Sequence, residues 1–351
     1  MHMKTDSKIT VWLITASAGL MAAGLSSCSD SDEPDMRPPA SDATPYITQV
    51  LDYVPAPGQF VNTMPEYEAG DTQETMNRKV LDAIGNNRKS TISLGGYGGY
   101  VTVGFDHTIE NKEGLCDFRI LGNAFYSDAN PNPDAPAGGS SEPGVIMVAY
   151  DRNGNGMPDG DEWYEIAGSA HRDPSQEAWY TLAQENGNDV HTYKDYEITY
   201  YRPDREPSTP EEKKQYIRWT DDKGNSGYKV MNGSHSQPYF PQWITGDRLT
   251  FKGTRLPQNG IDESGQGSYF VLYKFGYGYA DNDMNKGKDA CIDIGWAIDA
   301  QGNPANLPGV DFIRVYTGVN QENGWLGECS TEIAGMEDLH LLGEEIPSVH
   351  P

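Results

Sequence analysis

Cysteine is scarce in this chain, which has four cysteines in 351 residues. One of them, Cys28, lies near the N-terminus, so Cys116, Cys291 and Cys329 remain for the rest of the chain. Three is an odd number, and the sequence allows either one disulfide with one buried thiol or no disulfide at all. A disulfide-rich scaffold is excluded, and the chain is long enough to bury a core of its own.

Positive charge is also scarce. The chain has 26 lysines and arginines against 52 acidic residues, which gives a formal net charge of −26. A chain this acidic is not expected to bind nucleic acid or an anionic lipid surface. An excess of carboxylates does suit the binding of calcium, which prefers oxygen ligands.

Catalytic motifs are lacking as well. The seven histidines show no paired spacing on a predicted helix, and no Gly-x-Ser-x-Gly segment is present. These absences speak against a zinc hydrolase and against a serine hydrolase. Acidic residues are so frequent that their spacing does not exclude the paired carboxylates of a glycosidase. We nevertheless predict that the protein is not an enzyme.

Long hydrophobic runs are confined to the N-terminus. Lys4 and Lys8 precede an apolar stretch, residues 9–24, that is too short and too rich in small residues for a good membrane span. The segment Leu25-Ser26-Ser27-Cys28 follows, and it resembles a bacterial lipobox. We predict a signal peptide over residues 1–27 and a lipid anchor on Cys28; the alternative is an ordinary signal peptide with a chance cysteine.

An acidic segment, residues 29–35, comes directly after Cys28. It resembles the export tag of Bacteroidetes lipoproteins that reach the outer cell surface, and the alternative is a solvated linker. Residues 28–45 are rich in Ser, Asp and Pro, so we expect them to be a disordered tether. The predicted location is the outer membrane, lipid-anchored and facing the cell exterior.

The most specific motif is a calcium-loop pattern over residues 151–162. It has oxygen-bearing side chains at loop positions 1, 3, 5 and 9, glycine at position 6 and glutamate at position 12. The predicted calcium ligands are Asp151, Asn153, Asn155, Met157 through its carbonyl, Asp159 and Glu162. The flanks, residues 144–150 and 163–168, are rich in β-forming residues, so we place the loop in a β-hairpin with a structural ion. The alternative is a polar hairpin without an ion.

The remaining pattern is mainly β, with one or two short helices. We expect helices over about 72–84 and after Thr209. Residues 95–99 are glycine-rich and favour a turn or a close backbone approach. The predicted strands are 92–94, 100–105, 118–122, 144–150, 163–168, 196–200, 248–251, 268–273, 292–298 and 312–317. Short strands separated by turn signals indicate a β-sandwich over residues 90–345, preceded by a lead-in, residues 46–89, with the first helix.

Two further segments suggest binding. Asp281, Asn282, Asp283 and Asn285 are candidates for a second cation, with a polar turn as the alternative. The Pro-rich segment 232–243 combines aromatic rings with hydrogen-bonding side chains, which suits a sugar face or the edge of a corrin. The candidate ligand contacts are His235, Tyr239, Phe240, Trp243 and, further on, Trp325. For the large aromatics the alternative is that they plug the end of the sandwich.

Several segments together resemble a family of Bacteroidetes "cell surface protein" lipoproteins over about residues 90–342. They are residues 94–106, 117–125, 141–144, the loop from Asp151 with residues 163–165, and residues 278–282, 311–320 and 324–328. The resemblance implies a jelly-roll-like sandwich related to carbohydrate-binding modules, but it marks no ligand contact residue by residue. Family members tend to be encoded beside outer-membrane corrinoid uptake systems.

The resemblance therefore implies capture of a corrinoid such as vitamin B12 for a TonB-dependent transporter. The alternative is a carbohydrate-binding surface lipoprotein of a glycan-uptake system, and after that a glycoside hydrolase. The two binding functions are separated by a direct test with cyanocobalamin or polysaccharide.

Overall fold

A computed structural model describes residues 36–88, 90–126 and 138–350 of the chain. The predicted signal peptide, Cys28 and the acidic segment after it lie outside these residues. Within the described part, no helix is long and apolar enough to pass through a bilayer. The fold is mainly β, as predicted from the short strands and frequent turns.

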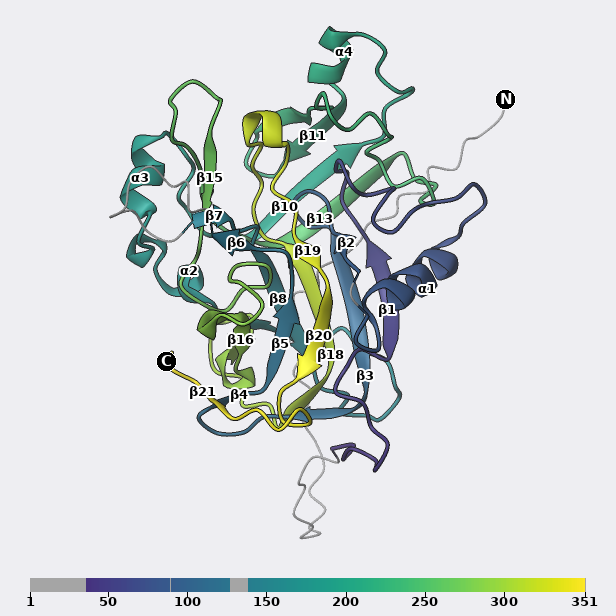
Figure 1. The fold of residues 1–351 in the computed structure, drawn as a ribbon, viewed down its shortest axis with the longest axis vertical. Helices are drawn as coiled ribbons and strands as arrows, with labels where there is room; N and C mark the ends of the chain where they lie inside the picture. Colours follow the sequence, from purple (N-terminus) through teal and green to yellow (C-terminus); the bar gives the residue numbers. More distant parts are fainter. Residues whose placement is uncertain (1–35, 89, 127–137, 351) are drawn as a thin grey trace, which may run out of the picture.

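The largest sheet has six antiparallel strands and runs through the centre of the molecule (Figure 1). Its order is β1-β3-β18-β8-β9-β17. The strands are β1 (Gln49–Val54), β3 (Tyr100–Glu110), β18 (Gly309–Thr317), β8 (Gly144–Ala149), β9 (Trp163–Ile166) and β17 (Ala297–Ile298). The late strand β18 lies between the early strands β3 and β8, so segments from both ends of the chain share one core.

Two four-stranded sheets flank the central sheet. The first has the order β12-β11-β10-β13 and the second β14-β15-β7-β6. The first contains β12 (Ser226–Lys229), β11 (Ile217–Asp221), β10 (Tyr193–Tyr201) and β13 (Arg248–Arg255). The second contains β14 (Gly260–Asp262), β15 (Phe270–Tyr273), β7 (Gly138–Ser140) and β6 (Phe125–Tyr126).

Three small sheets complete the β structure. One has the order β16-β5-β20, and the others are the pairs β19-β2 and β21-β4. Their strands are β16 (Cys291–Ile292), β5 (Phe118–Leu121), β20 (Gly335–Asp338), β19 (Glu332–Ile333), β2 (Ile92–Ser93), β21 (Ile346–Pro347) and β4 (Leu115–Cys116). The C-terminal strands thus pair with strands from the first third of the chain.

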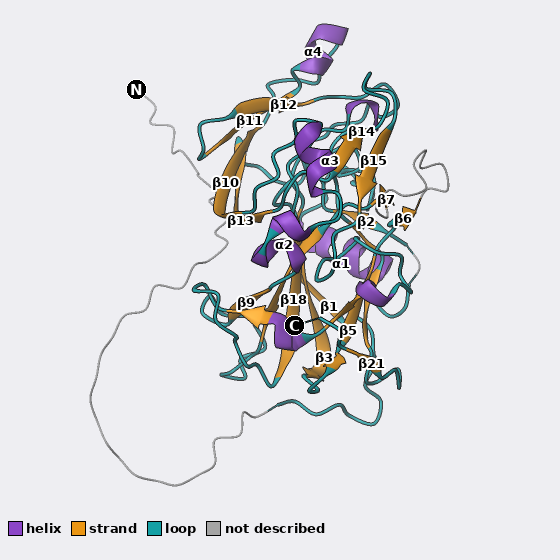
Figure 2. Cartoon of the chain, turned by 90° about the vertical axis from the view of Figure 1, so that its left-hand side faces the viewer, coloured by secondary structure: helices purple, strands orange, loops and turns teal. Residues whose placement is uncertain are grey.

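In the described part of the chain, four α-helices lie around these sheets (Figure 2). They are α1 (Gln73–Ile84), α2 (Ser169–Arg172), α3 (Tyr180–Glu185) and α4 (Pro210–Lys214), with short 3₁₀ turns at Pro174–Gln176, Lys288–Ala290, Ile294–Trp296 and Gly324–Leu326. The helix predicted over 72–84 is confirmed as α1, capped by Thr72. The helix predicted after Thr209 is confirmed as α4, with Thr209 and Glu212 forming a capping box.

The lead-in is part of the central sheet and is not an irregular approach to it. Strand β1 lies at the edge of that sheet, and α1 packs beside β1 and β2. The predicted tether also ends earlier than residue 45. Arg37 forms an ion pair with Asp311 of β18 at 2.7 Å, and its backbone exchanges hydrogen bonds with Thr108 of β3. The chain is therefore laid against the sheet from residue 37 onward.

The glycine-rich segment 95–99 makes a close backbone approach, as expected. Gly95 has a φ of +68°, and a Cβ atom there would lie 2.0 Å from the carbonyl oxygen of Ala56. Glycine is the residue that tolerates both the left-handed conformation and the missing space. The predicted strand 292–298 is wrong, because Asp293 accepts a hydrogen bond from the backbone N–H of Gly295 and starts a 3₁₀ turn between β16 and β17.

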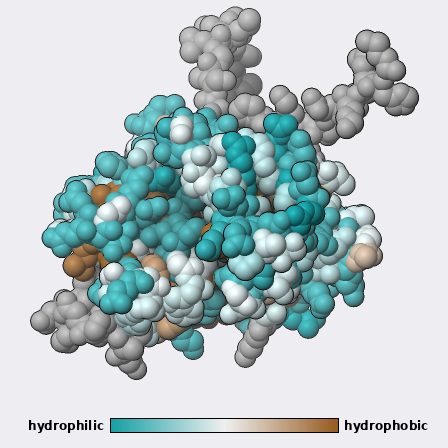
Figure 3. All heavy atoms as spheres, turned by 90° about the horizontal axis from the view of Figure 1, so that it is seen from above, coloured by the Kyte–Doolittle hydropathy of each residue, from teal (hydrophilic) through white to brown (hydrophobic). Residues whose placement is uncertain are grey.

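The surface agrees with the charge of the chain. The face seen from above in Figure 3 is mostly hydrophilic, with apolar side chains gathered in small patches. Small, separate apolar patches are ordinary on a protein surface and do not by themselves mark a partner.

Candidate functional site

The β-hairpin predicted around residues 151–162 is formed. Strands β8 and β9 pair in antiparallel register, with Ala149 opposite Trp163 and Met147 opposite Glu165. The loop between them turns at Gly154 and Gly156, whose φ angles are +68° and +77°. The loop therefore has the sharp turn that position 6 of the motif requires.

Backbone N–H groups of the loop point at its carboxylates. Asp151 accepts hydrogen bonds from the N–H groups of Asn155 (3.1 Å) and Gly156 (2.8 Å). Glu162 accepts from the N–H groups of Arg152 and Asp159, both at 2.9 Å. Through these hydrogen bonds Asp151 and Glu162, the first and last predicted ligands, both contact the backbone of the loop.

The other predicted calcium ligands close the same ring. Asp159 accepts from the side-chain amides of Asn153 (2.6 Å) and Asn155 (3.0 Å). Met157 has an exposed side chain, so only its backbone is available to the loop interior. The donor set is entirely oxygen, which fits a hard cation such as calcium. Hydrogen bonds thus join the predicted calcium ligands within the loop, but Asp151, Asp159 and Glu162 do not bring three carboxylate oxygens within 4.8 Å of one another.

Among the described residues, one set of three acidic groups offers ligand atoms within 4.8 Å of one another. It consists of Glu142, Asp281 and Glu332, which we call the acidic triad. Asp281 Oδ1 accepts the N–H groups of Asn123 (2.7 Å) and Ala124 (2.8 Å), and Oδ2 accepts that of Glu332 (2.9 Å). Glu142 lies just before β8, Asp281 lies in the segment after β15, and Glu332 is the first residue of β19.

Burial dominates the electrostatics of the acidic triad. It raises the pKa of Glu142 to about 8 and that of Asp281 to about 7, and it raises the pKa of Glu332 as well. The neighbouring carboxylates push in the same direction for Glu142 and Glu332. The triad therefore holds protons at neutral pH or shares its charge with a cation.

The four residues expected to hold a second cation do not converge. Asp281 belongs to the acidic triad, while Asn282 bonds the backbone of Phe275 with both ends of its amide. Asp283 lies 3.0 Å from the ammonium group of Lys274, and Asn285 bonds the backbone of Gly122. The sequence spacing therefore identified one member of the acidic triad, Asp281, but it did not identify Glu142 or Glu332.

The aromatic segment 232–243 is largely internal. Tyr239 and Phe240 are fully or almost fully buried, and Trp243 is 8% exposed. Trp243 stacks on Tyr53 with ring centroids 5.7 Å apart and donates its indole N–H to Gln73 of α1. These rings offer no free face to a ligand, so the alternative of core packing describes their positions.

The two other aromatic candidates are more accessible. His235 is half-buried, with its ring edge-on to Phe60 at 4.6 Å. Trp325 is 61% exposed and donates its indole N–H to the carbonyl oxygen of Ser268 at 3.2 Å. The structure therefore separates Trp325, with an open ring, from Tyr239, Phe240 and Trp243.

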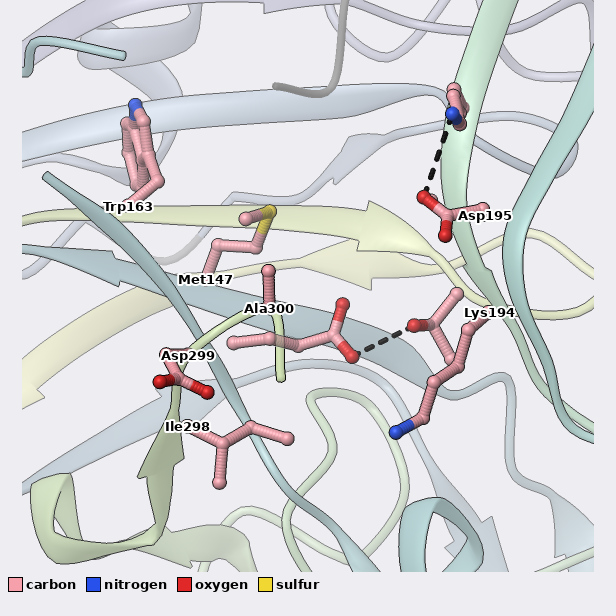
Figure 4. Close-up of a pocket in the computed structure, with 11 residues that line it drawn as sticks. Met147, Trp163, Lys194, Asp195, Ile298, Asp299 and Ala300 are labelled. Atoms are coloured by element: carbon pink, nitrogen blue, oxygen red, sulfur yellow. Dashed lines mark hydrogen bonds and ion pairs between the residues drawn. The ribbon is translucent and has the colours of Figure 1, made fainter. Parts of the chain in front are cut away.

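A pocket that sequence reasoning did not find lies where the central sheet meets the sheet of β10 and β13. Figure 4 shows Ile298 and Asp299 on one side, Lys194 and Asp195 on the other, and Met147 and Ala300 between them. Its volume is about 130 Å³, and Trp163, Glu165, Lys252, Gly253 and Thr254 complete its lining. We call it the Glu165 pocket.

Strand register explains why these residues face one space. Trp163 and Glu165 are two residues apart on β9, and Met147 is the partner of Glu165 across the ladder, so all three share a face. Strands β10 and β13 add Lys194, Asp195 and Thr254 from the opposite side. Lys252 lies 3.5 Å from Asp195 at the rim.

Glu165 is the best-supported group in the pocket. Its side chain is 19% exposed and accepts hydrogen bonds from His171 (2.5 Å), Thr254 (2.8 Å) and Tyr316 (3.2 Å). Burial opposes ionisation, but the charge of His171 and these three hydrogen bonds outweigh it and lower the pKa of Glu165. Glu165 is therefore a carboxylate at neutral pH, held as an acceptor.

His171 lies behind Glu165 and away from solvent. Its side chain is 1% exposed, with one ring nitrogen against Glu165 and the other 2.9 Å from the hydroxyl of Tyr279. Both nitrogens are thus engaged within the protein, and the ring also stacks on that of Tyr279. This arrangement positions Glu165 and leaves no imidazole nitrogen free to reach a bound molecule.

Comparisons with known proteins do not assign the chain to a family. No protein-family profile matches the chain, and no curated protein shows significant similarity to it.

Proposed function

We propose that the protein is a lipid-anchored, surface-exposed lipoprotein of the outer membrane that captures a ligand and does no chemistry on it. We place the ligand in the Glu165 pocket. The observation that carries the proposal is an ionised, solvent-reaching carboxylate fixed by three buried donors, between an apolar wall and two lysines. A few fixed polar groups on an apolar background are typical of small-molecule sites.

The chemistry of the pocket favours binding over catalysis. A glycosidase needs a carboxyl group with a raised pKa as its general acid, whereas the pKa of Glu165 is lowered. His171 is sequestered between Glu165 and Tyr279 and has no path to a substrate. What remains is a good acceptor for the N–H or O–H groups of a ligand.

A corrinoid is the first candidate ligand, on the resemblance of the chain to lipoproteins encoded with corrinoid uptake systems. Corrinoids carry amide side chains and a phosphate. In this proposal an amide N–H bonds Glu165, the phosphate lies by Lys194 and Lys252, and the apolar ring edge lies on Met147 and Trp163. The protein then passes the ligand to a TonB-dependent transporter.

A glycan is the second candidate, and the size of the pocket favours it. A volume of about 130 Å³ is below the usual range for drug-sized ligands and would take a single sugar unit or only the edge of a corrinoid. Sugar hydroxyls would bond Glu165, and the ring of Trp163 offers an apolar surface beside it.

Two parts of the proposal concern architecture. Calcium in the loop of residues 151–162 would stabilise the hairpin that carries Trp163 and Glu165, with no part in binding the ligand. The sheets would form a jelly-roll-like sandwich, which is supported by the placement of the late strand β18 between β3 and β8.

The test is a titration of the purified chain with cyanocobalamin, followed by the visible spectrum, and in parallel with soluble polysaccharides on an affinity gel. We expect Glu165→Gln to weaken binding about 10-fold to 100-fold, since a hydrogen bond to a charged group contributes about 1.5–3 kcal/mol. The matched control is Glu74→Gln, an exposed residue of α1 at the far edge of the central sheet. If Glu165→Gln and Glu74→Gln bind the ligand with equal affinity, the ligand does not bind in the Glu165 pocket. If the protein binds neither cyanocobalamin nor polysaccharide, both candidate ligands are wrong.

A further inference from the structure

Two of the three internal cysteines lie together in a satellite of the core. Cys116 of β4 is 3% exposed and Cys291 of β16 is 2% exposed, and both pack with Leu339 and Ile346. Both are free thiols in the structure, and each lies close enough to affect the ionisation of the other. The third, Cys329, is buried within the main core and does not belong to this cluster.

The backbone holds the two cysteines in place. The N–H of Asp117, next to Cys116, bonds the carbonyl oxygen of Ile292, next to Cys291, at 2.8 Å. The side chain of Asp117 also accepts the N–H of Ile294 at 2.8 Å. The two sulfur atoms therefore meet across segments that are already tied together, although about half of the chain lies between them.

Cys116 and Arg119 both favour the thiolate form of Cys291. The guanidinium group of Arg119 pairs with Glu337 (3.0 Å) and Glu344 (2.6 Å), and its buried Nε has no hydrogen-bond partner. Arg119 also interacts with Cys291 across the β5–β16 ladder, where the two residues are opposite each other. The hydrogen bond from Cys116 and the nearby Arg119 lower the pKa of Cys291 to about 7, while the pKa of Cys116 is raised.

We propose that Cys116 and Cys291 form a disulfide in the exported protein and that Cys329 remains a thiol. The proposal rests on the export proposed above, because disulfides persist in oxidising compartments. The oxidant is a second disulfide, of a protein or of a small thiol compound. The Cys291 thiolate attacks one of its sulfur atoms and releases a thiolate. Cys116 loses its proton and attacks the mixed disulfide at the Cys291 sulfur, releasing the second thiolate.

The balance is two cysteine thiols oxidised and one external disulfide reduced to two thiols, with two electrons transferred. Access limits when this occurs, because both sulfur atoms are buried and β21 pairs directly over β4, with Ile346 opposite Cys116. The reaction therefore takes place before the C-terminal segment of residues 340–350 docks. The bond then ties β4 to β16 beneath that segment.

The first test is made on the full chain in cells. Free thiols are blocked with N-ethylmaleimide before lysis, and peptides of the membrane fraction are mapped by mass spectrometry without reductant. We expect a cross-linked peptide pair containing Cys116 and Cys291, and an alkylated Cys329. Alkylation of both Cys116 and Cys291 in the membrane fraction overturns the proposal.

The second test separates the geometry from the export. The purified, reduced chain is unfolded in urea and refolded by dilution with glutathione disulfide. Both variants are made in a Cys28→Ala chain, so that thiols of the folded part alone are counted. Cys28→Ala with Cys329→Ser should then lose all of its free thiols by an internal disulfide, whereas Cys28→Ala with Cys116→Ser should keep a free or glutathione-capped Cys291. Persistence of two free thiols in Cys28→Ala with Cys329→Ser overturns the pairing itself. If the pair oxidises here and the cellular protein is reduced and absent from the membrane, the export has failed and the geometry stands.

Discussion

Trp243 gives the sharpest test of the distinction between a core aromatic and a ligand contact. Its ring is 8% exposed and stacks on the rings of Tyr53 and Tyr67, with centroid distances of 5.7 Å and 6.2 Å. Its indole N–H donates to Gln73 of α1 at 3.2 Å, which ties the aromatic segment to the first helix. Trp243→Ala would remove the ring, both stacks and this hydrogen bond together.

The expected cost follows from burial. Truncation of a buried tryptophan to alanine usually lowers the free energy of unfolding by about 3–5 kcal/mol, because a cavity remains. For a domain of this size that corresponds to a fall in melting temperature of roughly 6–10 °C, at about 2 °C per kcal/mol. The oxygen of Gln73 left without its donor adds to the cost.

Urea unfolding followed by circular dichroism measures the effect, and Trp325→Ala is the matched control. Trp325 is 61% exposed, so its removal should lower the free energy of unfolding by about 1 kcal/mol or less. Affinity per folded molecule should be unchanged in Trp243→Ala. A Trp243→Ala protein that keeps its stability but loses ligand affinity would refute the assignment of this ring to the core.

Three further predictions concern the calcium loop, the acidic triad and the anchor. EDTA should lower the melting temperature and calcium should restore it, adding about 1.4 kcal/mol at ten times Kd, and neither should act on Asp151→Ala; a melting curve of the metal-free wild type that added calcium leaves unchanged would contradict this. Because the pKa of Glu142 is raised from 4.5 to about 8, the folded state binds more protons than the unfolded one between these values. In EDTA, stability should therefore fall as pH rises from about 4.5 to 8, and less steeply in Glu142→Gln; equal slopes in urea titrations would argue against it. Cys28→Ala should release the protein from the membrane fraction, and a mutant that still sediments with outer membranes at high salt would contradict the lipid anchor.

Local signals allowed part of this structure to be predicted. The β8–β9 hairpin, α1 and α4 each depend on residues close together in the chain: the hairpin partners Ala149 and Trp163 are 14 positions apart, and the capping box joins Thr209 to Glu212. The close backbone approach at Gly95 was also predictable from a local signal, because the run of glycines alone indicates it.

The Glu165 pocket could not be predicted in this way. Glu165 reads as one residue of a short strand, and its partners Thr254 and Tyr316 are 89 and 151 residues away. Their meeting depends on how two sheets pack, which periodicity does not reveal. His171 is only six residues away, but α2, which presents it, left no recognised signal in the sequence.

For the aromatic segment 232–243, the sequence suggested a binding site where the structure has core packing. A Pro-rich run with Tyr239, Phe240 and Trp243 suits an exposed binding loop and an internal plug equally well. The rings that enclose Trp243 come from Tyr53 and Tyr67, in the lead-in that we had placed before the main domain. Since β1 and α1 are integral to the fold, the segment has a surface to pack on.

The most direct test of the central claim is a crystal structure of the protein with saturating cyanocobalamin or, failing binding, with a bound oligosaccharide. The account predicts ligand density in the Glu165 pocket, with an N–H or O–H group of the ligand donating to Glu165 and the ligand lying against Trp163 and Lys252. Ligand density at another surface, with water alone in the Glu165 pocket, would contradict it.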